Sequence, residues 1–402
     1  MWRSAPRAEQ RRGTAVTAAR SLMTAVLASA LAVPCVAEAA PPRHVAPSLR
    51  AVTTSTTPVK SDESVQAAIQ RTPTGGVAYL PQGAFRTKVV IERPMTLVAH
   101  SRGTTFDGGN LGGAVVTIAP GVTDVRIEGL VVRNASEEGI FADAATERLS
   151  LSRVTVASCG TDGIRLVGAI GARLDLCVLE DNTGDGIDAE GSGLWATRVT
   201  AQRNGGSAVV VRGMGARVSD LVVVGGRTGL LVEGSASVLE RCRFVGAGTA
   251  VRFGEGSWGN RLANSYVQGG GTAIEATAGS RSATIVDVVA QGLAGDAIRL
   301  AGSSHVLQDC DVSGGGANAL VLSGTGSSVE GCRVLDVLGE GLRLEGDGHI
   351  AAGNRIEAAA TEGIHVAWGL GNEVTGNVVL RCGGRGIADD GIDTLMSRNR
   401  ID

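Results

Sequence analysis

The feature that most constrains this chain is a repeat of 21–24 residues. A small residue followed by an aliphatic residue recurs twelve times, and the intervals never leave that range. The aliphatic positions are Ile140, Ile164, Ile187, Val209, Leu230, Val251, Ile274, Ile298, Leu320, Leu342, Ile364 and Ile387. Period-2 alternation in short runs separated by glycine is typical of strands and not of helices. The 59 glycines among 402 residues suit a chain that bends tightly and often.

A second column of residues lies nine or ten positions before these aliphatic residues. Its members are small or amide side chains: Cys177, Cys242, Asn264, Cys310, Cys332, Asn354 and Asn377. One coil of this length cannot bury its apolar face alone, so it must stack on its neighbours. The sequence therefore predicts an all-β fold, a parallel β-solenoid with 21–24 residues per coil.

The second column predicts an interior ladder. An asparagine amide can satisfy backbone groups of adjacent coils, and cysteine is small and tolerates burial. Buried free thiols are therefore expected. Cys310 and Cys332 stand in adjacent coils, so a bridge between these two remains an alternative.

The first 60 residues read differently. A basic leader, the apolar run SLMTAVLASALAV and the small-x-small pattern Ala37-Glu38-Ala39 predict a signal peptide over residues 1–39. The apolar run is too short to span a bilayer, so no membrane span is expected, and the protein should be secreted, periplasmic or at the cell surface. Residues 40–60 are rich in Pro, Thr and Ser and read as a linker.

Residues 61–71, SDESVQAAIQR, predict a short helix. Asp62 would stand near its N-cap, and Val65, Ala68 and Ile69 would lie on one face.

The repeats DGIRL, EGLRL and GNRIE, together with this helix and the following TGGVAYLPQGAF, resemble secreted right-handed parallel β-helix proteins of the pectin-lyase superfamily. The resemblance covers residues 61–402 and implies one right-handed parallel β-helix with an N-terminal capping helix. It does not fix an activity, because lyases, hydrolases, epimerases and non-enzymes share this scaffold.

One acidic stretch, DNTGDGIDAEG, contributes to a charged cluster of Asp162, Arg165, Asp185, Asp188 and Glu190. Strand alternation predicts that the first and third residues after each aliphatic position face solvent. The resemblance to pectate-lyase-like enzymes implies Ca²⁺ ligands among Asp162, Asp185, Asp188 and Glu190, with Arg165 as the base and Asp162 as a further catalytic candidate. The alternative is a surface ion pair between Arg165 and Asp188.

A second cluster surrounds His365, whose neighbours include Glu340, Arg343 and Glu362. Its ordinary pKa suits an acid/base role, although a solvated histidine in a charged ladder is the alternative. His305 and His349 are expected in turns without acidic partners, and no role is assigned to them.

Three tryptophans, Trp195, Trp258 and Trp368, are candidates for sugar stacking or for loop packing. Their offsets from the aliphatic positions differ, so they need not line one groove.

The net charge of −3 and the lack of a basic domain or Arg/Lys stripe argue against nucleic acid as a partner. Two functions remain. The first is an exported β-helix protein that binds polysaccharide or has a structural role at the cell surface. The second is a calcium-assisted polysaccharide lyase or epimerase acting on acidic polysaccharides. The printed sequence stops as a new coil begins, and an open parallel edge favours self-association.

Overall fold

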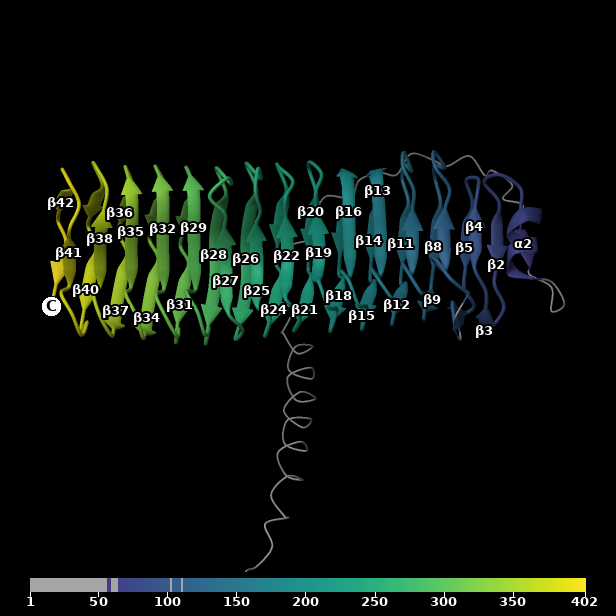
Figure 1. Cartoon of the computed structure of the whole chain (residues 1–402), viewed down its shortest axis with the longest axis horizontal. Coiled ribbons are helices and arrows are strands. Elements are labelled where there is room, and N and C mark those ends of the chain that lie inside the picture. The colour runs from purple at the N-terminus through teal and green to yellow at the C-terminus, as the bar shows by residue number, and fades with distance from the viewer. Residues whose placement is uncertain (1–55, 59–63, 102, 110) are drawn as a thin grey trace, which may run out of the picture. The chain divides into compact units, whose positions relative to one another are not determined.

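The computed structural model describes residues 56–58, 64–101, 103–109 and 111–402. The predicted signal peptide and most of the predicted linker lie outside these residues. The described part is a parallel β-solenoid: each coil adds one strand to a 14-stranded sheet and further strands to a 29-stranded sheet (Figure 1). The all-β expectation is confirmed.

The 14-stranded sheet comprises β4 (Val89–Ile91), β7 (Val116–Ile118), β10 (Ile140–Ala142), β13 (Ile164–Ile170), β16 (Ile187–Ser192), β19 (Ser207–Val211), β22 (Thr228–Val232), β25 (Thr249–Phe253), β27 (Thr272–Ala276), β29 (Ile298–Ser303), β32 (Leu320–Thr325), β35 (Leu342–Asp347), β38 (Ile364–Trp368) and β41 (Ile387–Asp389).

The 29-stranded sheet has two runs of strands that meet at a bend in each coil. The first run comprises β1 (Thr56–Pro58), β2 (Val77–Tyr79), β5 (Thr96–Val98), β8 (Arg126–Glu128), β11 (Ser150–Ser152), β14 (Arg173–Asp175), β17 (Trp195–Thr197), β20 (Arg217–Ser219), β23 (Val238–Glu240), β26 (Arg261–Gln268), β28 (Thr284–Gln291), β30 (Val306–Gln308), β33 (Ser328–Glu330), β36 (Ile350–Ala352), β39 (Glu373–Thr375) and β42 (Leu395–Ser397). The second run comprises β3 (Gly83–Arg86), β6 (Thr104–Asp107), β9 (Leu130–Arg133), β12 (Thr155–Ala157), β15 (Val178–Glu180), β18 (Thr200–Gln202), β21 (Val222–Val224), β24 (Arg243–Val245), β31 (Asp311–Ser313), β34 (Arg333–Val337), β37 (Arg355–Ala359), β40 (Val378–Leu380) and β43 (Arg400–Ile401). Strands β26 and β28 continue through the bend and belong to both runs.

The repeated aliphatic residues stack in register along the 14-stranded sheet. Ile140 pairs with Ile164, Ile164 with Ile187, and the series continues without a slip to Ile364 and Ile387. These side chains are buried, apart from a partly covered Ile387. Burying an aliphatic side chain of this size contributes about 1.5–3 kcal/mol relative to leaving it exposed, so this single column is a large part of the core.

The predicted Cys/Asn ladder is confirmed at six of its seven positions. The bend in each coil uses one residue with a left-handed backbone, followed by the buried ladder residue. The backbone N–H of Cys332 donates to Asn354 Oδ1 at 2.9 Å, and that of Asn354 donates to Asn377 Oδ1 at 2.9 Å.

The assignment of Asn264 to this ladder was wrong. Asn264 is exposed and takes the left-handed position, with φ of 50°. Ser265 fills the ladder instead, and its Oγ accepts the N–H of Cys242 at 3.1 Å. Asparagine suits both places, because it tolerates the left-handed region better than most residues.

The cysteines in the described residues are all free thiols. Burial raises the pKa of Cys177 to about 11 and that of Cys242 to about 12, so both stay protonated and unreactive. Hydrogen bonding to Cys332, together with burial, also raises the pKa of Cys310. A thiol ladder is what the structure holds, and no bridge joins Cys310 to Cys332.

Helix α2 (Val65–Arg71) covers the N-terminal end of the stacked coils (Figure 1). Val65, Ala68 and Ile69 are buried, as expected. The N-cap is Ser64, whose Oγ accepts the N–H of Ala67 at 3.2 Å, whereas Asp62 lies outside the described residues. No helix in the described part is long and apolar enough to cross a membrane.

The same helix also seals a strand edge. The Gln66 amide donates to the carbonyl of Val90 at 3.2 Å and accepts its N–H at 2.8 Å. Strand β4 is the first of its sheet, so this pair satisfies backbone groups that no preceding strand can reach.

Strand β1 departs from the predicted linker. Thr56–Pro58 pairs in parallel with β2, so the end of the 40–60 segment belongs to the sheet.

A second interior column was not foreseen. His305 and His349, expected in turns, are fully buried. His305 Nδ1 accepts the N–H of Ala283 at 3.1 Å, and His349 Nδ1 accepts that of Ser327 at 3.2 Å. Asn260 and Asn372 make the equivalent bonds in other coils. Because Nδ1 accepts, both rings are neutral with the proton on Nε2, where His305 reaches the carbonyl of Ala301 at 2.8 Å.

The aliphatic column should be sensitive to truncation. We expect Leu342→Ala to lower the free energy of unfolding by about 2–5 kcal/mol, because the side chain is fully buried and leaves a cavity. Leu338→Ala is the matched control from the same coil, since Leu338 is 71% exposed and should change stability by no more than about 0.5 kcal/mol. Urea unfolding followed by circular dichroism measures both. Equal losses would contradict the assignment of this column to the core.

Acid should weaken the coils that hold the two histidines. Burial lowers the pKa of His305 and of His349 below 6.5, so the unfolded chain binds protons that the folded chain refuses. Stability is therefore full above pH 6.5 and falls as the pH drops from 6.5 towards the folded pKa. The double variant His305→Asn/His349→Asn keeps the ladder bonds, as Asn260 and Asn372 do, without the titration. Its unfolding midpoint should vary less between about pH 7 and pH 5 than that of the wild type. An identical slope would show that other groups control it.

Candidate functional site

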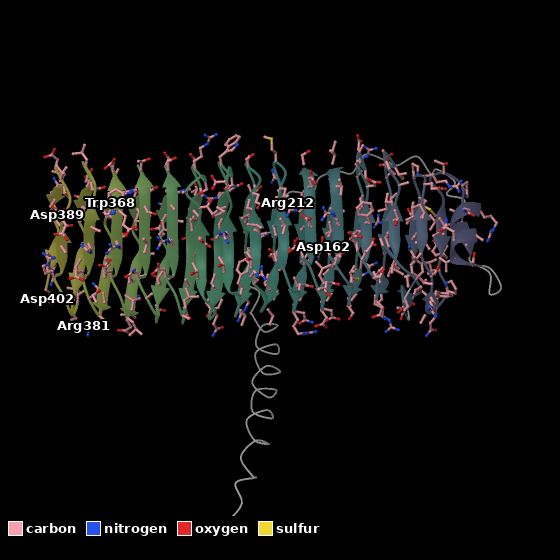
Figure 2. All side chains as sticks on the ribbon, viewed as in Figure 1. Asp162, Arg212, Trp368, Arg381, Asp389 and Asp402 are labelled. Atoms are coloured by element: carbon pink, nitrogen blue, oxygen red, sulfur yellow. The ribbon has the colours of Figure 1, made fainter. Side chains whose placement is uncertain are left out.

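The first predicted cluster lies on the 14-stranded sheet and is built as an ion-pair network. Arg165 pairs in register with Asp188, and its Nη1 lies 3.0 Å from Asp188 Oδ2 and 3.4 Å from Asp162 Oδ2. Arg212 contacts the other oxygen of Asp188 and also Glu233, at 3.1 Å from its Nε. Figure 2 marks Asp162 and Arg212 near the middle of the stacked coils.

The prediction that Asp188 faces solvent was wrong. Its side chain is only 6% exposed, because guanidinium groups on both neighbouring coils cover it. Burial of a carboxylate is tolerated here because each of its oxygens meets an arginine.

The side chains of Asp162 and Asp185 accept hydrogen bonds from the backbone of the next coil. Asp162 Oδ1 accepts the N–H of Asp185 at 2.7 Å, and Asp185 Oδ1 accepts that of Ser207 at 2.5 Å. Burial raises the pKa of Asp185 despite this bond to Ser207.

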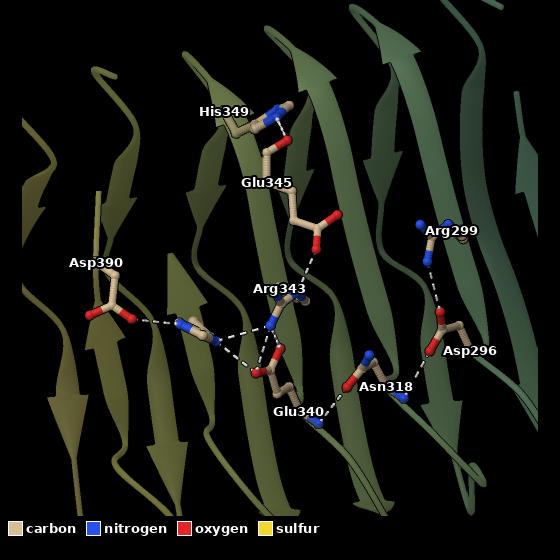
Figure 3. Close-up of polar contacts among 9 residues, drawn as sticks. Asp296, Arg299, Asn318, Glu340, Arg343, Glu345, His349 and Asp390 are labelled. Carbon is tan, nitrogen blue, oxygen red and sulfur yellow. Dashed lines mark hydrogen bonds and ion pairs between the residues drawn. The ribbon is translucent and has the colours of Figure 1, made fainter. Parts of the chain in front are cut away.

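The same arrangement recurs in later coils (Figure 3). Asp296 Oδ1 accepts the N–H of Asn318 at 3.1 Å, and Asn318 Oδ1 accepts that of Glu340 at 2.9 Å. Backbone capping thus explains the aspartates two residues before the aliphatic positions, Asp162, Asp185 and Asp296. The sequence held the clue in Asn318, an uncharged residue of the same shape in the same column.

These contacts bear on the predicted calcium site. Among the described residues, no group of three or more His, Cys, Asp and Glu side chains is placed to hold a metal ion. Asp185 and Asp188 already have protein donors, and Glu190 is exposed beside them. The donor set does not fit a resident Ca²⁺ as arranged, since Asp188 would have to leave two arginines. Metal binding by Asp185, Asp188 and Glu190 stays a prediction.

The second cluster centres on His365 in β38. Its Nδ1 lies 2.7 Å from Glu340 Oε1, and its Nε2 lies 3.1 Å from Asp390 Oδ2. Arg343 joins Glu340 and Glu345, with Nε 2.6 Å from Glu345 Oε1 (Figure 3). Burial acts to lower the pKa of His365, but bonding to Glu340 and Asp390 outweighs it and holds the pKa above 6.5. Carboxylates at both ring nitrogens favour the imidazolium form, whereas Arg343 Nη1, which lies 3.2 Å from Nδ1, opposes it.

The structure does not bring the predicted catalytic residues together. Arg165 lies in β13 and His365 in β38, nine coils away, which is roughly 43 Å at ~4.8 Å per coil. Arg165 and Asp162 can therefore act with each other, but not with His365.

The three tryptophans are half-exposed and lie in different places. Trp258 is in the turn before β26, and Trp368 ends β38. Trp195 opens β17 and borders a groove of about 320 Å³. The groove is lined by Trp195, Thr197, Arg217, Ser219, Glu240 and Arg241, among others. On the preceding coil, Arg173 stacks over the indole at 5.1 Å from its centroid.

Comparison with solved structures finds similar proteins at low sequence identity. The family 28 exopolygalacturonase of Yersinia enterocolitica is 10% identical, covering 87% of this chain and 78% of that one, with a TM-score of 0.49. The pectate lyase Pel9A is 12% identical, with coverages of 68% and 77% and a TM-score of 0.43. The A-module of the mannuronan C-5 epimerase AlgE6 from Azotobacter vinelandii is 15% identical, with coverages of 84% and 94% and a TM-score of 0.41. A search of curated proteins finds no match.

The family described as "Right handed beta helix region" matches residues 138–290 and 296–402, well over half of the chain. The matched segments contain most of the stacked aliphatic column and both interior ladders. The chain therefore belongs to the right-handed β-helix family.

Proposed function

We propose that this chain is an exported polysaccharide-binding β-helix protein, and that a sugar ring binds in the groove beside Trp195. The observation that carries the proposal is an exposed indole bordering a groove of about 320 Å³ whose walls carry hydrogen-bonding side chains. Export rests on the sequence of residues 1–39, with its basic leader and short apolar run.

The indole of Trp195 is held in place by a contact with Arg173. Arg173 lies against it from the preceding coil, while the groove is lined by Trp195 and by residues of the following coils. A cation–π contact of this kind contributes about 0.5–1 kcal/mol at an exposed site. Because tryptophan has only two side-chain torsions, a braced indole loses little entropy when a ligand stacks on it.

The rim of the groove can recognise hydroxyl groups. Ser219 and Thr197 offer hydroxyls, Glu240 offers a carboxylate, and Arg217 offers a guanidinium. Few, well-placed polar groups around an apolar surface are the usual make-up of a small-ligand site. A pyranose ring has matching surfaces, with C–H groups on its faces and hydroxyls on its edge.

The contacts on the 14-stranded sheet favour binding over catalysis. A lyase or epimerase using Arg165 as the base would need that side chain free to meet a sugar proton. Its guanidinium instead lies between Asp162 and Asp188. That arrangement supports a structural role for the network.

Loss of the indole should abolish most of the binding. We expect Trp195→Ala to weaken polysaccharide binding by at least about 30-fold, the effect of removing a central aromatic anchor worth roughly 2 kcal/mol. Affinity electrophoresis against a panel of neutral and acidic polysaccharides measures it. Trp258→Ala is the matched control, because Trp258 is 43% exposed against 44% for Trp195 and does not line this groove. If Trp258→Ala or Trp368→Ala loses binding while Trp195→Ala still binds normally, the sugar site lies at that other tryptophan and not at Trp195.

The catalytic alternative has its own test. Calorimetry with calcium should give no binding heat, and no unsaturated uronate should absorb in the ultraviolet when pectate or alginate is added. Calcium binding that disappears in Asp185→Ala/Asp188→Ala, together with rising absorbance, would restore the lyase hypothesis. Circular dichroism of the double variant would separate that result from simple unfolding, since both side chains also hold the backbone or arginines.

A further inference from the structure

The outward row of residues that contains Trp195 has a regular charge pattern. Strand pairing places one residue per coil in this row, and its members from β8 to β26 are Arg126, Ser150, Arg173, Trp195, Arg217, Val238 and Arg261. Arginine therefore occupies every second coil over seven coils. All four arginines are exposed. We call this set the arginine row.

Three other arginines, each in the adjoining bend, contact the carboxylates beside the arginine row. Arg153 contacts Glu128, and Arg198 lies 2.6 Å from Asp175. Arg241 lies 2.7 Å from Glu240 and 3.0 Å from Asp220, so these two carboxylates share one guanidinium.

The row itself is left with unbalanced positive charge. Arg126 has one loose contact, at 3.7 Å from Glu128. In the part of the chain that the structure describes, Arg173, Arg217 and Arg261 have no ion pair. Arg173 is engaged by the indole of Trp195, so Arg217 and Arg261 are the guanidiniums left to meet a ligand.

We propose that the arginine row binds a linear anionic polysaccharide that runs along the solenoid axis, across successive coils, with one sugar stacked on Trp195. This rests on the proposed function and names the ligand class and its direction. Neighbouring arginines of the row are about 9.6 Å apart, two coil spacings of ~4.8 Å. An extended pyranose chain advances by about one coil spacing per sugar, so acid groups on alternate sugars meet successive arginines.

The chemistry of the contact favours this ligand. A guanidinium forms paired hydrogen bonds with a carboxylate or a sulfate, and such charge-assisted bonds are the stronger ones. No cation is needed to bridge ligand and protein here, in contrast to the carboxylate-rich 14-stranded sheet. A single-stranded nucleic acid is disfavoured, because such ligands stack successive bases on several aromatic side chains and the row offers only Trp195.

The first experiment compares ligands. Polygalacturonate, a sulfated glycan and carboxyl-reduced polygalacturonate of the same length are each titrated into the protein. A chelator is present throughout, and each titration is made once at low salt and once at moderate salt. We expect the wild type to bind an acidic polymer at least about tenfold tighter than the reduced one, and to lose affinity as salt rises. The preferred acidic polymer tells whether carboxylate or sulfate is the natural group. Tighter binding of a polynucleotide would overturn the proposal.

The second experiment removes charges. Arg217→Gln should weaken binding of the acidic polymer about tenfold, Arg261→Gln by a smaller factor, and both should flatten the salt dependence. Binding of the reduced polymer should not change in Arg261→Gln, because Arg261 does not line the groove, and it should fall less than binding of the acidic polymer in Arg217→Gln. Arg333→Gln is the matched control, since Arg333 is exposed in β34 and has no ion pair in the described residues. Equal unfolding midpoints confirm that the variants fold.

The polysaccharide site and the anionic nature of its ligand can be disproved separately. If Trp195→Ala abolishes binding but acidic and reduced polymers bind alike, the polysaccharide site stands and the anionic ligand is wrong. If Trp195→Ala leaves all binding intact, the proposed function itself is wrong. An effect of Arg333→Gln equal to that of Arg217→Gln would show general charge attraction and overturn the arginine row.

Discussion

Parallel stacking in register controls every other feature of this structure. Each residue lies about 4.8 Å from its equivalents in the coils before and after, so a side chain's main neighbours are its own counterparts. Buried positions gain from this, as the unbroken column from Ile140 to Ile387 illustrates. Charged positions do not, because like charges directly opposite one another destabilise a sheet. Arg165 therefore faces Asp188, and Arg252 faces Glu275 at 3.5 Å.

The same rule distinguishes the two charged faces. On the 14-stranded sheet, Arg165 and Asp188 stand in adjacent coils and cancel one another, as do Arg252 and Glu275, while Arg343 and His365 share the carboxylate of Glu340. On the arginine row, repulsion is avoided by placing Ser150, Trp195 and Val238 between the arginines, which separates the charges without cancelling them. The charged side chains of the 14-stranded sheet are therefore paired mainly with one another. The arginine row retains positive charge beside an exposed indole, which is why it offers the better account of an external ligand.

The core was predictable from sequence, because burial repeats once per coil and leaves a mark every 21–24 residues. The errors at Asp188 and at the two buried histidines share one cause, because each side chain's role depends on a residue one coil away, such as Arg212 for Asp188 and Ala283 for His305. The error at Asn264 is a shift of one residue: Ser265, the next residue in the chain, fills the ladder. The arginine row could not be predicted from the single-coil repeat, because its arginines recur only every second coil, at intervals of 44 to 47 residues.

The interior ladders accept Cys, Asn, Ser and His at equivalent positions, and this has a consequence for how such a chain can change in length. Duplication or loss of one coil leaves the ladders and the aliphatic column in register. The arginine row is different: losing one of its coils would place two arginines side by side or open a wider gap between them. The core thus repeats with a unit of one coil, whereas the arginine row repeats with a unit of two coils. Recombination that preserves folding will preserve the surface only when it moves coils two at a time.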